Sequence, residues 1–315
     1  MKVIEHLANA KEPLVSFEII PPRRGGSLES LLGLIERLAK HRPPFIDITS
    51  HPAVISYEDG PKGLRRVVKR KRPGTLGLCA LVQHKFGIDA VPHVICRGFT
   101  KEETEDFLIE LHYLGIDNVL AIRGDDNGYD KPLPEGRSNN AYARDLVEQI
   151  TAMNQGAYLD RNQKSDPTKY CVGVAGYPEK HFEAPNLAED IANLKRKVDA
   201  GAEYVVTQMF FNNVHYFNFV DRCREAGITV PIIPGLKILA SHKQLTMLPK
   251  TFLCELPEEL VASARRAEGK SVVEVGIEWA LKQSQELLEA GVPALHYYVM
   301  QNTRAVDELL SRLKR

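Results

Sequence analysis

The sequence is poor in the residues that build disulfide frameworks and metal centres. Its 315 residues include five cysteines, at 79, 96, 171, 223 and 254, with no CxxC pair and no His/Cys spacing of the zinc-binding kind. Carboxylates are not clustered with histidines as a metal site would need. The pattern argues against a disulfide-stabilised secreted domain, predicts no metal, and favours a reduced, cytoplasmic location.

An excess of one charge and long apolar runs are also missing. Lys plus Arg and Asp plus Glu both number 41, so there is no broad basic surface of the kind that binds nucleic acid. No stretch approaches the roughly 18 apolar residues of a membrane span, and segment 1–13 lacks the apolar core of a targeting peptide. We therefore expect a soluble protein whose partners are small-molecule substrates, with neither nucleic acid nor membrane.

A dinucleotide-binding GxGxxG is absent after the first apolar run, which disfavours a doubly wound open sheet. What the chain does contain is a regular alternation of short apolar runs with helical patterns, typical of β-α units around a parallel sheet. Eight runs are expected as strands: 15–22, 45–49, 91–96, 118–122, 171–175, 203–208, 230–234 and 294–298. They predict an α/β fold, a single-domain (β/α)8 barrel of the TIM type over residues 1–315, with its active site at the C-terminal strand ends.

Some segments depart from this rhythm. Region 57–75 is rich in Lys and Arg and is interpreted as one solvated helix face, or as a surface that steers an anionic ligand. The polar loop 126–140 follows a strand end, where barrels place ligand-binding segments. Residues 237–270 should hold two short helices. Residues 272–288 should form a long amphipathic helix, in which Trp279 belongs to the core or an interface.

A single acid stands among apolar residues in the first run, VSFEIIPP. Because strand side chains alternate between faces, Glu18 shares a face with Ser16 and Ile20 and lies near the C-terminal end of its strand. Desolvation by its flanks should raise the pKa of the carboxyl toward the range of a proton donor. The alternative is a structural acid that is hydrogen-bonded to a neighbouring strand.

Polar and aromatic side chains also stand at the other strand ends, where a barrel would bring them into one pocket. They are Thr49, His93, Arg123, Gly124, Asp125, Tyr177, Gln208 and the segment 296–298. A Ser/His/Asp nucleophile arrangement does not stand out among them. Amides, aromatic rings and a guanidinium suit flat polar heterocycles and phosphates, so a cofactor-dependent enzyme is favoured.

Six segments together carry a family resemblance. They are 16–22 (SFEIIPP), 121–125 (AIRGD), 142–146 (YARDL), 175–184 (AGYPEKHFEA), 194–202 (LKRKVDAGA) and 207–211 (TQMFF). In this order they closely resemble bacterial methylenetetrahydrofolate reductase, from about Lys2 to Tyr298. The resemblance implies a barrel that moves a hydride from NADH or NADPH to FAD and then to methylenetetrahydrofolate by a ping-pong route. It also implies a place in one-carbon metabolism and methionine biosynthesis.

The same resemblance implies roles for individual residues. Glu18 matches the acid that protonates the departing folate nitrogen, and Asp125 matches a second catalytic acid that hydrogen-bonds the folate ring beside the flavin. Gln208 and Gln244 match substrate contacts. The matching FAD positions are Thr49, His93, Arg123, Gly124, Asp125, Tyr142, Ala143, Tyr177, His181, Ala184, Asp190, Asn193 and Lys197.

The resemblance further implies a homo-oligomer and favours NADH over NADPH. Larger relatives append a regulatory domain that binds S-adenosylmethionine. Because the chain ends soon after its last strand, we expect no such domain and no inhibition by that ligand. Leu248 stands where relatives carry a Phe that gates nicotinamide and folate. Two rival functions stay open: a non-redox barrel lyase or aldolase that uses Glu18 as its acid, and a non-catalytic flavin- or folate-binding protein.

Overall fold

The eight apolar runs pair as one parallel sheet. The computed structural model describes residues 1–60, 63–125, 128–162, 165–267, 271–300 and 303–313. Within them the sheet contains β1 (Leu14–Ile19), β2 (Phe45–Ile48), β5 (Asp89–Ile95), β6 (Asn118–Ile122), β7 (Cys171–Gly176), β8 (Tyr204–Thr207), β9 (Ile232–Ile233), β10 (Gly235–Leu236) and β11 (Ala294–Met300). The strand order is β10-β11-β1-β2-β5-β6-β7-β8-β9, and every neighbouring pair is parallel.

The ring closes through two very short strands. β9 pairs with β8, β10 pairs with β11, and only Pro234 separates β9 from β10. Proline has no N–H to give to a ladder, so it interrupts the strand. Its carbonyl still accepts a hydrogen bond from the His296 backbone N–H at 3.0 Å. β9 and β10 therefore act as one stave, and the predicted barrel of eight parallel staves is confirmed.

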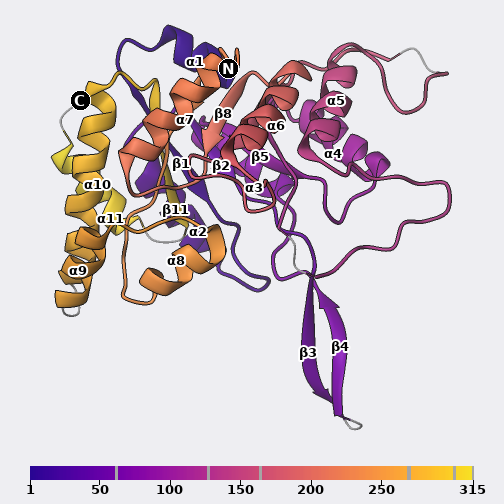
Figure 1. The fold of residues 1–315 in the computed structure, drawn as a ribbon. Helices are drawn as coiled ribbons and strands as arrows, with labels where there is room; N and C mark the ends of the chain where they lie inside the picture. The colour runs from indigo at the N-terminus through magenta and orange to yellow at the C-terminus, as the bar shows by residue number, and fades with distance from the viewer. Residues whose placement is uncertain (61–62, 126–127, 163–164, 268–270, 301–302, 314–315) are drawn as a thin grey trace.

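Helices surround the sheet (Figure 1). They are α1 (Val3–Asn9), α2 (Leu28–Ala39), α3 (Leu76–Ala80), α4 (Lys101–Tyr113), α5 (Ala143–Asn154), α6 (Leu187–Asp199), α7 (Asn213–Glu225), α8 (Gln244–Phe252), α9 (Glu258–Arg266), α10 (Ser271–Glu289) and α11 (Arg304–Arg312). The two helices predicted within 237–270 are α8 and α9, and the predicted long helix is α10. Trp279 of α10 donates a hydrogen bond from Nε1 to the Phe211 carbonyl oxygen at 2.9 Å, as a core Trp should.

Alternation along the strands divides the core into an outer and an inner layer. Val15, Phe17 and Ile19 of β1 are buried in the large cluster between sheet and helices. A smaller apolar cluster fills the N-terminal end of the barrel, and Val3 of α1 belongs to it. The Val3 backbone N–H donates to Asn118 Oδ1 at the start of β6, at 2.8 Å. Apolar packing under α1 thus closes the floor of the barrel.

The Lys- and Arg-rich region contains a β-hairpin, so its interpretation as a helix face was wrong. β3 (Val54–Gly60) and β4 (Gly63–Lys69) pair antiparallel, with Gly60 opposite Gly63. β-branched residues occur in both strands, Val54 and Ile55 in β3 and Val67 and Val68 in β4, and favour strand over helix. Gly63 adopts φ +104°, a value that glycine tolerates best. The hairpin projects away from the barrel, and most of its cationic side chains are exposed (Figure 1).

Two glycines inside helices should respond to alanine with opposite signs. A Cβ at Gly276 of α10 would lie 1.9 Å from the Leu239 carbonyl oxygen, a backbone atom with little freedom to move. We expect Gly276→Ala to destabilise the protein by about 1–3 kcal/mol. At Gly33 of α2 the nearest atom is the end of the Arg37 side chain, 3.6 Å away. Gly33→Ala should therefore stabilise by up to about 1 kcal/mol through helix propensity. Urea unfolding measures both variants, and equal effects would contradict the close packing of α10.

Candidate active site

β1 carries Glu18 to the mouth of the barrel, at the C-terminal ends of the strands. Ser16, two residues earlier on the same face, points into the barrel, where its Oγ lies 2.8 Å from His296 Nδ1 of β11. The Glu18 side chain is 13% exposed, and its Oε2 lies 3.5 Å from Nε2 of His93 on β5. Glu18 therefore faces inward, beside a histidine from a strand two places along the sheet.

The surroundings of Glu18 favour its protonated form. Burial raises the pKa of Glu18 to about 7. The charges of His93 and Lys237 act against burial, whereas those of Asp47 and Asp125 reinforce it. Burial would lower the pKa of His93, but the two carboxylates beside it, Asp47 and Glu18, outweigh burial and raise it. A carboxyl with a pKa near 7 can donate a proton at neutral pH, as the apolar flanks of the strand predict.

Two charged residues beside Glu18 were not predicted as site residues. Asp47 of β2 is the partner of Glu18 in the strand register, and it is fully buried. Lys237, directly after β10, donates from Nζ to the Tyr298 carbonyl oxygen at 2.6 Å, and burial lowers its pKa to about 8. Their positions in the sequence could have identified both residues. Asp47 lies two residues before Thr49 on the same strand face, and Lys237 follows a strand end.

The end of β6 places predicted FAD residues on one side of the mouth. The Arg123 guanidinium forms an ion pair with Glu183, and its central carbon lies 5.1 Å from the centre of the Tyr142 ring. Gly124 adopts φ +87°, and a Cβ there would lie 3.4 Å from the Ile95 Cβ. That distance is an ordinary van der Waals contact, so the positive φ, rather than a lack of space, is what favours glycine at this point.

Asp125 and the end of β7 complete this side of the mouth. Asp125 is exposed, and its charge contributes to the raised pKa values of Glu18 and Tyr177, for both of which burial is the main cause. The Tyr177 and His181 rings meet edge to face with their centres 4.6 Å apart. Two flat rings and a carboxylate thus approach the same opening as the buried acid.

The second cation among the predicted FAD residues is Lys197, on α6. Lys197 of α6 donates from Nζ to the Ala175 carbonyl oxygen at 2.6 Å, and burial lowers its pKa to about 8. Asp190 accepts a hydrogen bond from the His181 backbone N–H at 2.8 Å. Three further predicted FAD positions lie nearby in the chain or on the neighbouring helix: Ala184, which is buried, Asn193 of α6, and Ala143, the first residue of α5.

The two glutamines predicted to contact substrate each accept a backbone hydrogen bond through the side-chain oxygen. Gln208 Oε1, after β8, accepts from the Met209 backbone N–H at 2.9 Å. Gln244 Oε1, at the start of α8, accepts from the Ala240 backbone N–H at 2.6 Å. These bonds fix the orientation of both amides and leave their NH2 groups to donate. Leu248 is 1% exposed and packs in an apolar cluster.

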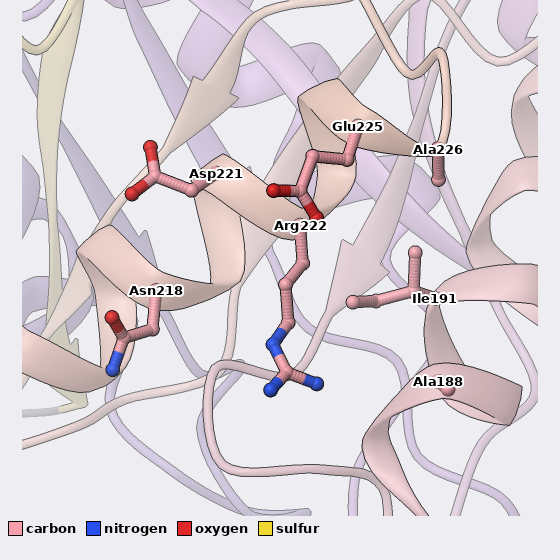
Figure 2. Close-up of a pocket in the computed structure, with 7 residues that line it drawn as sticks. All are labelled: Ala188, Ile191, Asn218, Asp221, Arg222, Glu225 and Ala226. Carbon is pink, nitrogen blue, oxygen red and sulfur yellow. The ribbon is translucent and has the colours of Figure 1, made fainter.

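An open groove of about 700 Å³ lies apart from these residues, between α6 and α7 (Figure 2). It is lined by Ala188, Ile191, Asn218, Asp221, Arg222, Glu225 and Ala226. None of the residues predicted for catalysis, substrate or FAD lines it. The groove is a surface seam between two neighbouring helices.

A histidine and two glutamates gather at another point among the described residues. One ligand-type atom from each of Glu179, His215 and Glu255 lies within 4.8 Å of the other two. Glu179 Oε2 accepts from the Glu255 backbone N–H at 2.7 Å, and His215 Nε2 lies 3.6 Å from Glu255 Oε2. These contacts link the loop after β7, helix α7 and the segment between α8 and α9, which gives the three side chains a structural role.

Comparison with known proteins assigns the chain to a family. Residues 3–314 match the family model described as methylenetetrahydrofolate reductase. The chain belongs to the methylenetetrahydrofolate reductase family. It is 30% identical over 301 residues to methylenetetrahydrofolate reductase 1 of Schizosaccharomyces pombe, covering 95% of this chain and 45% of that protein. It is also 30% identical over 289 residues to 5,10-methylenetetrahydrofolate reductase of Salmonella typhimurium, covering 91% and 86%.

This member of the reductase family spans about half the length of the yeast, worm and plant relatives that it matches. Among solved structures, an uncharacterized protein from Clostridium thermocellum that binds two copies of 5-methyl-5,6,7,8-tetrahydrofolic acid has a TM-score of 0.61 and 14% identity, covering 98% of this chain and 97% of that one. At this identity the likeness shows a shared fold. In the described part of the chain, every helix is too short or too polar to cross a membrane.

The raised pKa of Glu18 makes folding stability depend on pH. Between the ordinary value of 4.5 and about 7, the folded protein holds a proton that the unfolded chain has lost. This contribution is complete below 4.5 and is lost as the pH rises through 7. Glu18→Gln removes it, so the stability of this variant relative to the parent should increase by about 2–3 kcal/mol from about pH 5 to about pH 8. Urea unfolding at several pH values measures the difference, and a constant difference would contradict the raised pKa.

Proposed function

We propose that this chain reduces methylenetetrahydrofolate to methyltetrahydrofolate with NADH or NADPH, using bound FAD. Family membership and relatives named as NADH- and NADPH-dependent reductases support the reaction class. The observation that carries the proposal is a buried acid, Glu18, at the barrel mouth with a pKa of about 7. Opening the bridged methylene requires an acid at the departing folate nitrogen, and such a carboxyl holds a transferable proton near neutral pH.

The residues around the mouth fit a flavin nucleotide. Arg123 and Lys197 offer cations for a pyrophosphate, Tyr177 offers a flat ring, and Gly124 permits close approach of the backbone. The buried Thr49 hydroxyl has no hydrogen-bond partner within the described ranges, so a ligand atom can satisfy it. The other proposed FAD residues on the neighbouring strand end, loop and helices are His93, Asp125, Tyr142, Ala143, His181, Ala184, Asp190 and Asn193.

The side chains at the barrel mouth have separate proposed roles in the reaction. Bound FAD supplies a hydride carrier between nicotinamide and folate, which these side chains cannot replace. Glu18 holds the proton that the folate nitrogen takes up and is left as a carboxylate beside His93. Asp125 is proposed to hydrogen-bond the folate ring. Gln208 is proposed to contact folate and nicotinamide in turn, and Gln244 to contact substrate, each through the free NH2 of its fixed amide.

Removing the acid should separate the two half-reactions. Glu18→Gln keeps the size of the side chain but has no acidic proton, so folate reduction should fall by about 10²- to 10⁴-fold. Reduction of the bound flavin by NADH should stay nearly unchanged, because it needs no proton from Glu18. Anaerobic stopped-flow absorbance measures both steps. Glu12→Gln, at an exposed site before β1, is the matched control. An equal loss in both half-reactions would refute the role of Glu18.

The colour of the purified protein separates the proposal from its rivals. A protein that carries FAD is yellow, and its absorbance should bleach under NADH without oxygen and return with methylenetetrahydrofolate. A non-redox lyase would purify colourless. A non-catalytic flavin-binding protein would keep its colour but fail to turn over. Repeating the assay with NADPH compares the two nucleotides.

Two lysines of one helix provide a test of the flavin site. Lys197→Met removes the buried amine proposed to face the pyrophosphate and should weaken FAD binding by about tenfold or more. Lys195→Met removes an amine that is paired with Asp199 at the helix surface, so FAD binding should not change. Titration of the flavin-free proteins with FAD, followed by flavin fluorescence, gives both dissociation constants. Equal constants for the two variants would remove Lys197 from the site.

A further inference from the structure

Asp47 is a buried carboxylate that the proposed reaction does not use. It lies on β2 beside Glu18 in the parallel register and has 0% of its surface exposed. Neither of its carboxylate oxygens has a hydrogen-bond partner within the described ranges. Oδ2 lies 3.6 Å from His93 Nε2, too far for a good hydrogen bond but close enough for strong attraction between charges. Burying a carboxylate is strongly unfavourable unless a cation lies nearby.

The other titratable groups that face Asp47 do not supply a cation in direct contact. Burial lowers the pKa of His296 on β11, which is therefore neutral, and its Nδ1 lies against Ser16. Burial raises the pKa values of Tyr204 on β8 and Tyr298 on β11, and both stay uncharged. The Cys79 thiol, whose pKa is raised mainly by burial, also feels the Asp47 charge and stays uncharged. The charges of Lys237 and Asp125 act on Glu18. His93 is the cation that Asp47 meets.

His93 stands between two carboxylates at nearly equal distances. Its Nε2 is 3.5 Å from Glu18 Oε2 and 3.6 Å from Asp47 Oδ2. One protonated imidazole can balance one negative charge. If Asp47 supplies that charge, Glu18 stays neutral and keeps its proton. If Asp47 is uncharged, the imidazolium is balanced by an ionised Glu18, which has then released its proton to solvent.

We propose that Asp47 is a positioning residue, which holds the His93 imidazolium and thereby keeps Glu18 in the acid form that folate reduction requires. The proposal rests on the function proposed above and deepens it by one residue. Asp47 acts through His93 and touches neither folate nor flavin in this scheme. Its effect is on the protonation state of Glu18, so a pH profile reports it directly.

Asp47→Asn in the full-length, FAD-loaded protein tests this role. The variant keeps the shape of the side chain but removes its charge, so the pH at which folate reduction is half lost on the alkaline side should fall by about one to two units. The rate at low pH, the KM for folate and flavin reduction by NADH should change little. A merely structural role would lower the rate at every pH without moving the midpoint.

A second Asp→Asn variant provides the control. Asp89 also pairs with a histidine, His6, with Oδ2 and Nε2 2.6 Å apart, but at the opposite end of the barrel. Asp89→Asn should leave the pH midpoint where it is in the parent protein. His93→Gln removes the cation instead of the anion and should move the midpoint upward, so it tests the scheme even if Asp47→Asn fails to fold.

A titration without substrate separates this proposal from the proposed function. Infrared difference spectra follow the protonated carboxyl of Glu18, which is assigned by its loss in Glu18→Gln. This signal should disappear at a lower pH in Asp47→Asn than in the parent protein. An unchanged infrared midpoint would overturn the role of Asp47, even in a fully active enzyme. A shifted midpoint in a protein without reductase activity would support the Asp47 coupling and refute the proposed reaction.

Discussion

The balance of charge around one carboxyl inside a closed ring of strands is the constraint on which the rest of the structure depends. An ionised Glu18 would face a protein interior that solvates charge poorly. The barrel holds it between opposing influences: burial and Asp47 favour the neutral acid, while His93 and Lys237 favour the carboxylate. None of these groups is adjacent to Glu18 in the chain. The pairing of strands in the closed sheet brings them together.

The same closure explains why the mouth of the barrel carries the polar chemistry. Apolar packing under α1 fills the opposite end, and the candidate site residues lie where the strands finish. Each parallel strand ends at the same edge, and residues from β1, β5, β6, β7 and β8 therefore meet although they are far apart in sequence. In this arrangement the acid is carried by a rigid strand, whereas most of the proposed FAD contacts come from loops and helix starts.

Much of the fold and part of the site could be predicted because both follow from local patterns. The strand at 118–122 is visible in the sequence as an apolar run bounded by polar residues. Glu18 is visible as a single acid on one face of such a run. Two features could not be predicted from the sequence, for physical reasons. Most side chains of β4 are exposed, so this segment lacks the alternation of buried and exposed residues that marks a strand, and its structure depends on pairing with β3. Asp47 gains its importance from a register with β1, which a single strand does not encode.

β1 can complete its pairing only after almost the whole chain has been synthesised. It pairs with β2 on one side and with β11 on the other, and Ser16 and His296 of that second pair are 280 positions apart. Ribosomes add about 5–20 residues per second, so roughly 15–60 s separate the synthesis of these two residues. During that interval one edge of β1 has no partner, and the carboxyl near its end is still open to water. During synthesis this apolar edge must not associate with other chains. The acid can acquire its shifted pKa only after the last strand has docked.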